Sequence, residues 1–523
     1  MDILDNKDSK IGIVISTIDS PSTTKISFVG VNKEIHKGEY IQIKYKQGIL
    51  IGLVIDVVKT NRYFENNDSV KEFENNNIDI KDQFPVSDWE FLEGVVKPLG
   101  VFNEGMFLRS TYPVSPGQEV YLADINILKK FLHLKEDGIF LGNIQNPSLE
   151  VKFDINRLLQ KHLAILAQSG AGKSYLTSVL LEELLSRPEE KGGVATILFD
   201  THGEYSHFSE VLSSSNNSNN LNYKDYSFKT KKINSKDIKI GCSSLSAEFY
   251  YSLLPNLSHA QKRELSKIIS KLQEDKKHGA GPFDLKDIIK EINSSDIKEN
   301  ISSILISALY ELDSYKLFGK IDFPSIFDIV SLNNLTIIDI SKEINKKKKQ
   351  IILYYFAHKL FYARVNSNVI VPPFLLVVEE AHQFAPESAS RDKALAKGIL
   401  ETIAREGRKF GACICLISQR PVHLSTTVLS QANTHIILRI TNPYDLNHIA
   451  QSSEGLDQKS MDMITSLRVG EALIVGEASS YPVFFKVRKK NSIDSCLDVT
   501  LSSLSKSYLD FKMSKDKDVS AFI

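Results

Sequence analysis

The sequence predicts an α/β protein built on a mainly parallel sheet, with a small antiparallel β-barrel before it and a helical subdomain inserted into it. The prediction rests on three observations. Strand-sized apolar runs fill the first part of the chain, strands and amphipathic helices alternate from His162 onward, and residues 241–330 carry only helical spacing. The 523 residues are enough for several domains, each with its own core.

Residues 1–150 are the predicted barrel domain. Its apolar runs are short and separated by Gly, Pro and Asn, as in small antiparallel barrels. The runs lie at residues 11–15, 25–29, 40–44, 49–55, 90–96 and 119–122. We expect the barrel to close near residue 150 and the polar, Asn-rich stretch from Asn66 to Asn77 to be an insertion loop.

Residues 151–240 and 331–490 are the predicted α/β core. Buried strands are expected at residues 163–166, 194–199, 335–338, 374–378, 413–417 and 434–438. An amphipathic helix follows the first strand, and its apolar face is formed by Leu176, Val179, Leu180 and Leu184. The helical insertion separates the two parts of the core, residues 213–222 are predicted to be a surface loop, and residues 491–523 form a Lys/Ser-rich tail.

Composition excludes several classes of protein. No apolar stretch approaches the ~20 residues of a membrane helix, and the N-terminus lacks the order of a signal peptide. Cys413 and Cys415 are expected to be buried thiols on one side of a strand, and the four cysteines show no disulfide spacing, so we expect a cytoplasmic protein. The 64 basic and 64 acidic residues balance, so any contact with nucleic acid must be local.

The clearest motif is Ala167-Gln-Ser-Gly-Ala-Gly-Lys-Ser174, between a strand and a helix. It matches the phosphate-binding P-loop, whose glycines turn backbone N–H groups onto phosphate oxygens at a helix N-terminus. Lys173 would reach the β- and γ-phosphates, and Ser174 would offer its hydroxyl to Mg²⁺. The nucleotide-binding residues expected here are Gly170, Ala171, Gly172, Lys173, Ser174 and Tyr175. Ala167 replaces the usual first Gly, which a negative φ allows; the alternative is a Gly-rich turn before a surface helix.

A second motif is an apolar strand that ends in two acids, Glu379 and Glu380. In P-loop NTPases the first acid holds Mg²⁺ and the second polarises the attacking water. Glu379 is one methylene longer than the more usual Asp, and Glu380 occupies the position of the catalytic base. Acidic residues often end strands, so the two glutamates alone are weak evidence for an ATPase site. Together with the P-loop they become strong evidence.

Two polar stretches follow other strands. Asp200, His202 and Glu204 lie just after a buried strand, at the edge of the sheet where ligands of such sheets bind. Gln419, in Ser-Gln-Arg-Pro, follows the strand after the acids and is placed to sense the γ-phosphate. A polar turn and a strand ended by Pro421 are the structural alternatives.

Arg405 closes a helix whose buried face is predicted to contain Leu395, Ile399 and Ile403. Arg405 lies about 200° round the helix from Ile403 and therefore points outward, with Arg408 one turn further on that side. Such an arginine can serve a neighbouring subunit's nucleotide as an arginine finger. The alternative is a Glu401–Arg405 surface pair worth only ~0.3–0.5 kcal/mol, and the residues alone favour it.

Together these motifs give the chain a resemblance to the HerA family of the HerA/FtsK superfamily. The resemblance rests on the P-loop, residues 200–205, Glu379-Glu-Ala-His382, Arg405-Glu-Gly-Arg-Lys409, Ser418-Gln-Arg-Pro421, and Arg439 before Asn442-Pro443. It implies a RecA-like core behind a HAS-type barrel similar to that of rotary ATP synthase subunits. It also implies a homohexameric ring that binds ATP and Mg²⁺ between subunits, with Arg405 acting in trans and duplex DNA in the pore.

The resemblance adds further candidate residues and partners. Lys161, before the P-loop strand, stands where a second basic residue commonly acts in the family, and Arg439 is a further candidate site residue. Archaeal members work with a nuclease in DNA-end processing. Bacterial members are often paired with an effector, such as a nuclease or a sirtuin-like NAD hydrolase, in antiviral defence.

Two functions therefore stand side by side: a DNA translocase or helicase motor, and an assembly ring that gathers and licenses an effector enzyme. A rotary or protein-secretion ATPase would share the barrel and the P-loop, but it fits residues 200–205 and 418–421 poorly. The lysine run from Lys346 to Lys349 is expected to be a solvated helix start rather than a DNA contact, because an amphipathic pattern follows it.

Overall fold

The computed structural model describes residues 10–31, 34–64, 70–71, 75, 84–103, 105–145, 148–211, 223–366, 371–389, 394–453, 455–493 and 501–521. The predicted loop at residues 213–222, and all but three residues of the predicted loop at 66–77, lie outside this part of the chain. The described chain divides into two compact units. The first contains residues 1–176, 419–422 and 432–488, and the second contains residues 177–418, 423–431 and 489–523.

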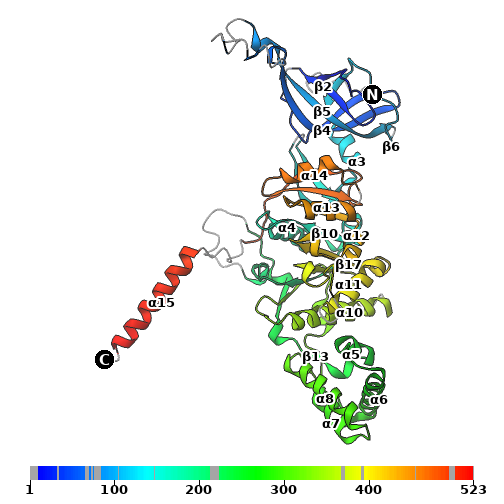
Figure 1. The fold of residues 1–523 in the computed structure, drawn as a ribbon, viewed down its shortest axis with the longest axis vertical. Helices are drawn as coiled ribbons and strands as arrows, with labels where there is room; N and C mark the ends of the chain where they lie inside the picture. Colours follow the sequence, from blue (N-terminus) through cyan, green and yellow to red (C-terminus); the bar gives the residue numbers. More distant parts are fainter. Residues whose placement is uncertain are drawn as a thin grey trace. The chain divides into compact units, whose positions relative to one another are not determined.

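The first unit begins with a closed antiparallel barrel (Figure 1). Its strands are β1 (Lys10–Ile15), β2 (Ile26–Gly30), β3 (Tyr40–Tyr45), β4 (Gly48–Asn61), β5 (Glu90–Asn103) and β7 (Glu119–Leu122). They are ordered β2-β1-β7-β3-β4-β5, a β2–β5 pairing closes the barrel, and the short β6 (Met106–Leu108) extends it from β5. Phe28 fills its interior, and a Cβ at Gly12 or Gly94 would come within 2.4 Å of that ring.

The barrel is shorter than the sequence suggested. Its last strand ends at Leu122, and the short helix α3 (Ile125–Phe131) follows. The next strands, β8 (Leu134–Ile144) and β9 (Leu149–Phe153), belong to a different sheet, because β8 pairs with β20 (Val483–Val487) near the end of the unit. The barrel was predicted to close near residue 150, but it ends at Leu122. The pairing of β8 with β20 joins segments more than 300 residues apart, and no local sequence pattern reports it.

The same unit contains the strand that leads into the P-loop. β10 (Leu163–Leu166) pairs in parallel with β18 (Thr434–Ile437), and antiparallel pairs continue through β19 (Glu471–Gly476) to β20, β8 and β9. The helices of this part are α13 (Pro443–Ser452) and α14 (Gln458–Thr465), and the N-terminal turn of α4 (Lys173–Ser186) also lies here. Every residue of β10 and β18 is buried, as expected for strands covered on both faces.

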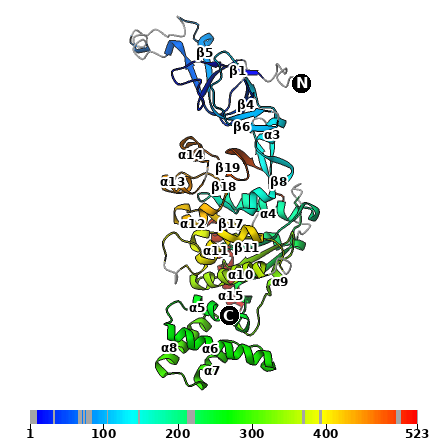
Figure 2. The same cartoon turned by 90° about the vertical axis from the view of Figure 1, so that its right-hand side faces the viewer.

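The second unit is built on a parallel sheet. Its strand order is β12 (Thr230–Asn234), β15 (Leu335–Asp339), β11 (Ala195–Asp200), β16 (Phe374–Val378) and β17 (Ala412–Ser418). The helices outside the inserted subdomain are most of α4, from residue 177 onward, and α9 (Ile326–Ile329), α10 (Lys346–Asn366), α11 (Leu395–Glu406), α12 (Thr426–Gln431) and α15 (Leu501–Ala521). Helices α10 and α11 lie side by side (Figure 2). The lysine run lies at the start of α10 as predicted, but it is less solvated than expected: Lys346 is exposed, whereas Lys347 and Lys348 are half-buried and pair with Glu311 and Glu343.

The predicted helical insertion is confirmed between β12 and β15. It contains α5 (Ala247–Leu253), α6 (His259–Asp275), α7 (Leu285–Ser294) and α8 (Glu299–Ser314). Its two ends meet in a two-stranded parallel sheet, β13 (Ile240–Gly241) and β14 (Phe318–Gly319). We call residues 240–245 and 317–325, where the chain enters and leaves the insertion, the neck.

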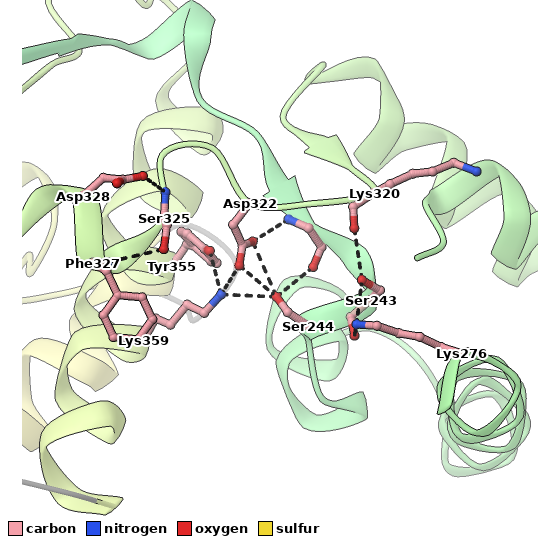
Figure 3. Close-up of polar contacts among 11 residues, drawn as sticks. Ser243, Ser244, Lys276, Lys320, Asp322, Ser325, Phe327, Asp328, Tyr355 and Lys359 are labelled. Atoms are coloured by element: carbon pink, nitrogen blue, oxygen red, sulfur yellow. Dashed lines mark hydrogen bonds and ion pairs between the residues drawn. The ribbon is translucent and has the colours of Figure 1, made fainter. Parts of the chain in front are cut away.

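The neck is tied to α10 by one carboxylate, Asp322 (Figure 3). Asp322 accepts hydrogen bonds from the backbone N–H of Gly241 at 2.6 Å and from the Ser244 hydroxyl at 3.2 Å, and it forms an ion pair with Lys359 of α10. Lys359 also donates to Tyr355, one turn earlier in the same helix, at 3.0 Å. Both strands of the neck are therefore fixed to one helix of the core.

Candidate active site

The P-loop has the backbone geometry that its sequence predicts. Gly170 and Gly172 have φ values of 75° and 99°, in the left-handed region that favours glycine. Ala167 is buried and its φ is not positive, so having alanine in place of the usual glycine at that position causes no backbone strain. Helix α4 begins at Lys173, so its N-terminal N–H groups and positive dipole end face the turn. Lys173 and Ser174 are half-buried and Tyr175 is exposed.

The loop after β18 is fastened to the P-loop through Gln168. The backbone N–H of Gln168 donates to the carbonyl of Arg439 at 3.1 Å. The backbone N–H and the hydroxyl of Thr441 donate to the side-chain oxygen of Gln168 at 3.1 and 2.9 Å. The backbone of Arg439 therefore lies beside the P-loop, and its side chain is exposed.

Lys161 lies away from its own P-loop. It precedes β10, whereas the P-loop follows β10, and a strand of this length spans about 13 Å. Its ammonium group forms an ion pair with Glu477 at 2.9 Å. Lys161 is therefore a pairing residue at the end of β10 opposite to the P-loop.

The two acids at the end of β16 are both fully buried. One carboxylate oxygen of Glu379 accepts hydrogen bonds from the backbone N–H and the hydroxyl of Thr201, each at 3.0 Å. Glu380 has φ 51° and ψ 45°, a left-handed conformation that is uncommon for a residue with a side chain. Burying a charged carboxylate costs free energy unless polar groups surround it. The groups next to Glu379 and Glu380 therefore determine whether these carboxylates can stay charged.

Asp200 shapes the loop that follows β11. Its carboxylate accepts four backbone N–H groups, from His202, Gly203, Glu204 and Tyr205, at 2.6 to 3.2 Å. Burial raises the pKa of Asp200 and the charge of Asp339 adds to the rise, although these hydrogen bonds oppose it. Asp200 therefore acts within the loop rather than as an open ligand, and the half-buried Glu204 is part of the same turn.

This loop places His202 next to Glu380. Nε2 of His202 lies 3.7 Å from Oε1 of Glu380. From the other side, Nδ1 of His382 lies 3.4 Å from Oε2 of Glu380 and 3.1 Å from the hydroxyl of Ser418, the last residue of β17. The contact with the Glu380 carboxylate raises the pKa of His202, and the charge of Glu379 adds to the rise, against partial burial of the ring.

The remaining candidates are Gln419, Arg405 and Arg408. Gln419 follows β17 directly and is half-buried. Arg405 points outward as predicted, with 56% of its side chain exposed, and it also lies 3.8 Å from Glu401, so the surface pair of the alternative interpretation is present as well. Arg408 is exposed in the 3₁₀ turn after α11, at Gly407–Phe410.

Sequence reasoning assigned no role to three residues of this site. Thr201 was not singled out, although it gives Glu379 two hydrogen bonds, and Ser418 was seen only as the residue before Gln419. His382 was noted only as the end of the Glu-Glu-Ala-His motif. The available signal was position: Thr201 follows β11, His382 follows β16, and Ser418 ends β17, so parallel strands bring all three to one edge.

Comparison with known proteins shows which proteins this chain is similar to. A family model described as the central domain of helicase HerA matches residues 139–360. A probable helicase of Methanocaldococcus jannaschii is 29% identical, with 97% of each chain aligned. The DNA double-strand break repair helicase HerA of Saccharolobus solfataricus is 25% identical over 91% of this chain and 92% of that protein, and the one from Pyrococcus furiosus is 28% identical over 86% and 87%.

The fold also has a counterpart among solved structures. The VirB4 structure of Thermoanaerobacter pseudethanolicus has a TM-score of 0.52 and 17% identity, and it covers 68% of this chain and 97% of that one. This likeness supports the P-loop NTPase fold. The P-loop turn, the strand ending in two buried acids and the similarity over most of the chain lead to one conclusion: the protein is a P-loop ATPase that is similar over most of its length to helicases of the HerA family.

Proposed function

We propose that this ATPase is the subunit of a homohexameric ring that binds duplex DNA and translocates it by hydrolysing ATP. We further propose that the ring works with an effector enzyme, a nuclease or a sirtuin-like NAD hydrolase, in antiviral defence or DNA-end processing. The observation that carries the proposal is the P-loop turn ahead of α4, together with a buried Glu380 at the end of β16. Alignment over most of the chain with proteins named DNA double-strand break repair helicases supports the choice of DNA.

In this proposal the P-loop residues Gly170 to Tyr175 hold the nucleotide. Backbone N–H groups and Lys173 bind the phosphates. The hydroxyl of Ser174 and the carboxylate of Glu379 are the hard oxygen donors that Mg²⁺ prefers. In the described part of the chain no group of three or more His, Cys, Asp or Glu residues could hold a metal ion, and this fits an ion held largely by phosphate and water. Bound Mg²⁺ would neutralise phosphate charge.

Hydrolysis is assigned to residues at the ends of β16, β17 and α11. Glu380 polarises the attacking water and takes its proton, and Gln419 senses the γ-phosphate. Arg405 serves the nucleotide of a neighbouring subunit, where its charge stabilises the transition state. Arg408, in the turn after α11, and Arg439, after β18, carry exposed basic side chains and are secondary candidates.

Two substitutions test the assignment of the site. Lys173→Ala should weaken ATP binding, because a charged partner of the phosphates is lost. Glu380→Gln should bind ATP normally and stop hydrolysis, because only the water-activating carboxylate is removed. Equilibrium binding of a fluorescent ATP analogue and steady-state ATPase rates distinguish the two effects. Wild-type turnover by the Glu380→Gln protein would contradict the assignment.

DNA dependence separates the motor from the alternative, an assembly ring that recruits and licenses an effector. The balance of 64 basic and 64 acidic residues neither excludes DNA nor supports it, since it provides no overall attraction to DNA. If the ring is a motor, duplex DNA should stimulate the ATPase, and DNA affinity should fall steeply with salt. Unchanged ATPase activity and no DNA binding at low salt would favour the assembly ring.

Among the described residues, no helix has the length and apolar character required to cross a bilayer. Proteins that co-purify with the full-length chain are the place to look for the effector. A nuclease or NAD hydrolase recovered with the ring, in a fixed ratio by mass photometry, would support the partnership. Recovery of the ring alone under the same conditions would count against a stable complex.

A further inference from the structure

The carboxylate of Glu380 has an imidazole on each of its oxygens. His202, from the loop after β11, presents Nε2 to Oε1 at 3.7 Å. His382, two residues after Glu380, presents Nδ1 to Oε2 at 3.4 Å. Both are ion-pair contacts rather than hydrogen bonds. A carboxylate is negatively charged and offers no proton, so each ring favours turning a protonated nitrogen toward it.

The His382 ring is itself held by β17. Its Nδ1 lies 3.1 Å from the hydroxyl of Ser418, which is fully buried at the C-terminal end of that strand. The next residue is Gln419, the proposed γ-phosphate sensor. A short path of polar contacts therefore runs from the strand that carries the sensor, through Ser418 and His382, to the proposed catalytic base.

A base that activates water must be held in one orientation. A misplacement of about 1 Å in a catalytic group can lower a rate by ~10²-fold. The Glu380 side chain has several rotatable bonds, and its backbone is in a left-handed conformation that gives it no help from a regular element. Contacts to both carboxylate oxygens remove the remaining freedom of rotation.

We propose that His202 and His382 are positioning residues that fix the carboxylate of Glu380 from its two sides, and that Ser418 couples His382 to the strand carrying Gln419. The proposal rests on the assignment of Glu380 as the water-activating base. It assigns His202 a defined role within the loop shaped by Asp200. It also predicts that the two histidines act through different ring nitrogens.

That difference gives a crossed test with amide isosteres. The side-chain N–H of Asn overlays Nδ1 of a histidine, and that of Gln overlays Nε2. His382→Ala and His202→Ala should each lower kcat by about 10- to 100-fold, with little change in KM or in ATP affinity. His382→Asn and His202→Gln should recover kcat to within about threefold of wild type, whereas His382→Gln and His202→Asn should stay low.

A second measurement tests the coupling to Ser418. Ser418→Ala removes one hydrogen bond to His382, so kcat should fall by about threefold to tenfold. The double variant Ser418→Ala/His382→Ala should be no slower than His382→Ala alone, since both changes break the same path. Additive losses would show that Ser418 acts independently and would remove it from the proposal.

His259→Asn is the matched control, because His259 is exposed at the start of α6 in the helical insertion, and it should leave kcat unchanged. Each variant is checked for folding by circular dichroism and for ATP binding. If the Ala variants keep wild-type kcat, or if both positions prefer the same isostere, the positioning role is wrong. An unaltered rate in Glu380→Gln would instead overturn the assignment of the base, so the two failures are distinguishable.

Discussion

Glu380 has a left-handed backbone conformation, which residues with a side chain rarely adopt. A left-handed conformation costs a residue with a Cβ about 1–2 kcal/mol, and glycine has no such cost. The chain keeps a glutamate there, at the end of a buried strand, where both of its oxygens face imidazoles. Strain of this kind persists where the surrounding structure holds the residue in place, and it clusters at functional sites.

A pair of variants isolates this backbone strain. Glu380→Ala and Glu380→Gly both remove the carboxylate, so both should be inactive. Because only alanine keeps the Cβ, Glu380→Gly should be more stable by about 1 kcal/mol in chemical denaturation. The same pair at Ser270, inside α6, is the control, and there the Ala variant should be the more stable by a similar amount. Equal stabilities of the two Glu380 variants would show that the strain is relieved elsewhere.

At the scale of elements, the neck decides how the helical insertion is attached to the core. Burial opposes the charge of Asp322, but hydrogen bonds from Lys359, Tyr355 and Gly241 outweigh it and hold the pKa of Asp322 below its usual value. The charged form is therefore the one that the folded neck prefers. Lys359, which contacts Asp322, lies on α10 (Figure 3). The attachment therefore passes through a helix that also packs on α11.

Asp322→Asn should loosen the insertion without unfolding the core. The loss should be about 1–3 kcal/mol, because a carboxylate with several partners becomes an amide. Amide hydrogen exchange should accelerate in α5 to α8 more than in the strands of the sheet. A variant of the exposed Lys271–Glu291 pair within the insertion, Glu291→Gln, is the control and should cost less than about 1 kcal/mol. Uniform acceleration across the unit would contradict a local role.

The same variant has a defined pH dependence. A carboxylate whose folded pKa is depressed contributes stability that is present above its unfolded pKa, about 3.9, and is lost as pH falls through the folded pKa. The difference between wild type and Asp322→Asn should therefore be constant from pH 7 to pH 5 and shrink below about pH 4. A difference that shrank already between pH 7 and pH 6 would point to another titrating group.

At the scale of the whole molecule, Arg405 links the single chain to the proposed ring. Arg405 is exposed at the end of α11, and its side chain lies 3.8 Å from Glu401. A surface ion pair of this kind contributes less than about 1 kcal/mol to stability, so the pair leaves the arginine available for another role. If it acts in trans, Arg405→Ala should lower kcat by as much as ~10³–10⁵-fold while ATP binding is largely retained. Steady-state rates and equilibrium binding measure the two quantities.

Mixed rings test whether the arginine acts across an interface. Combining Arg405→Ala with Lys173→Ala subunits should restore part of the activity, because some interfaces then pair an intact P-loop with an intact arginine. Mixed rings that assemble and stay inactive would count against the trans role. An experimental structure of the nucleotide-bound ring with Arg405 far from every neighbouring P-loop would return it to a surface salt bridge.

The sequence by itself determined the elements and the chemistry of the motifs. The strands β7, β10 and β16 have the bounds that their apolar runs predicted, because short buried runs bounded by turn residues are a local signal. The P-loop turn was likewise predictable, since the two glycines at Gly170 and Gly172 are required by the local backbone. The burial of Cys413 and Cys415 followed from their place in an apolar strand.

Only the tertiary structure decided which distant segments meet. The pairing of β8 with β20, which ends the barrel at Leu122, depends on hydrogen bonds between segments that no periodicity connects. Likewise, Thr201 and His202 reach Glu379 and Glu380 across 178 residues because β11 and β16 are neighbours in the sheet. Residue types and spacing report what a segment forms locally, whereas strand order and side-chain packing determine which groups share a site.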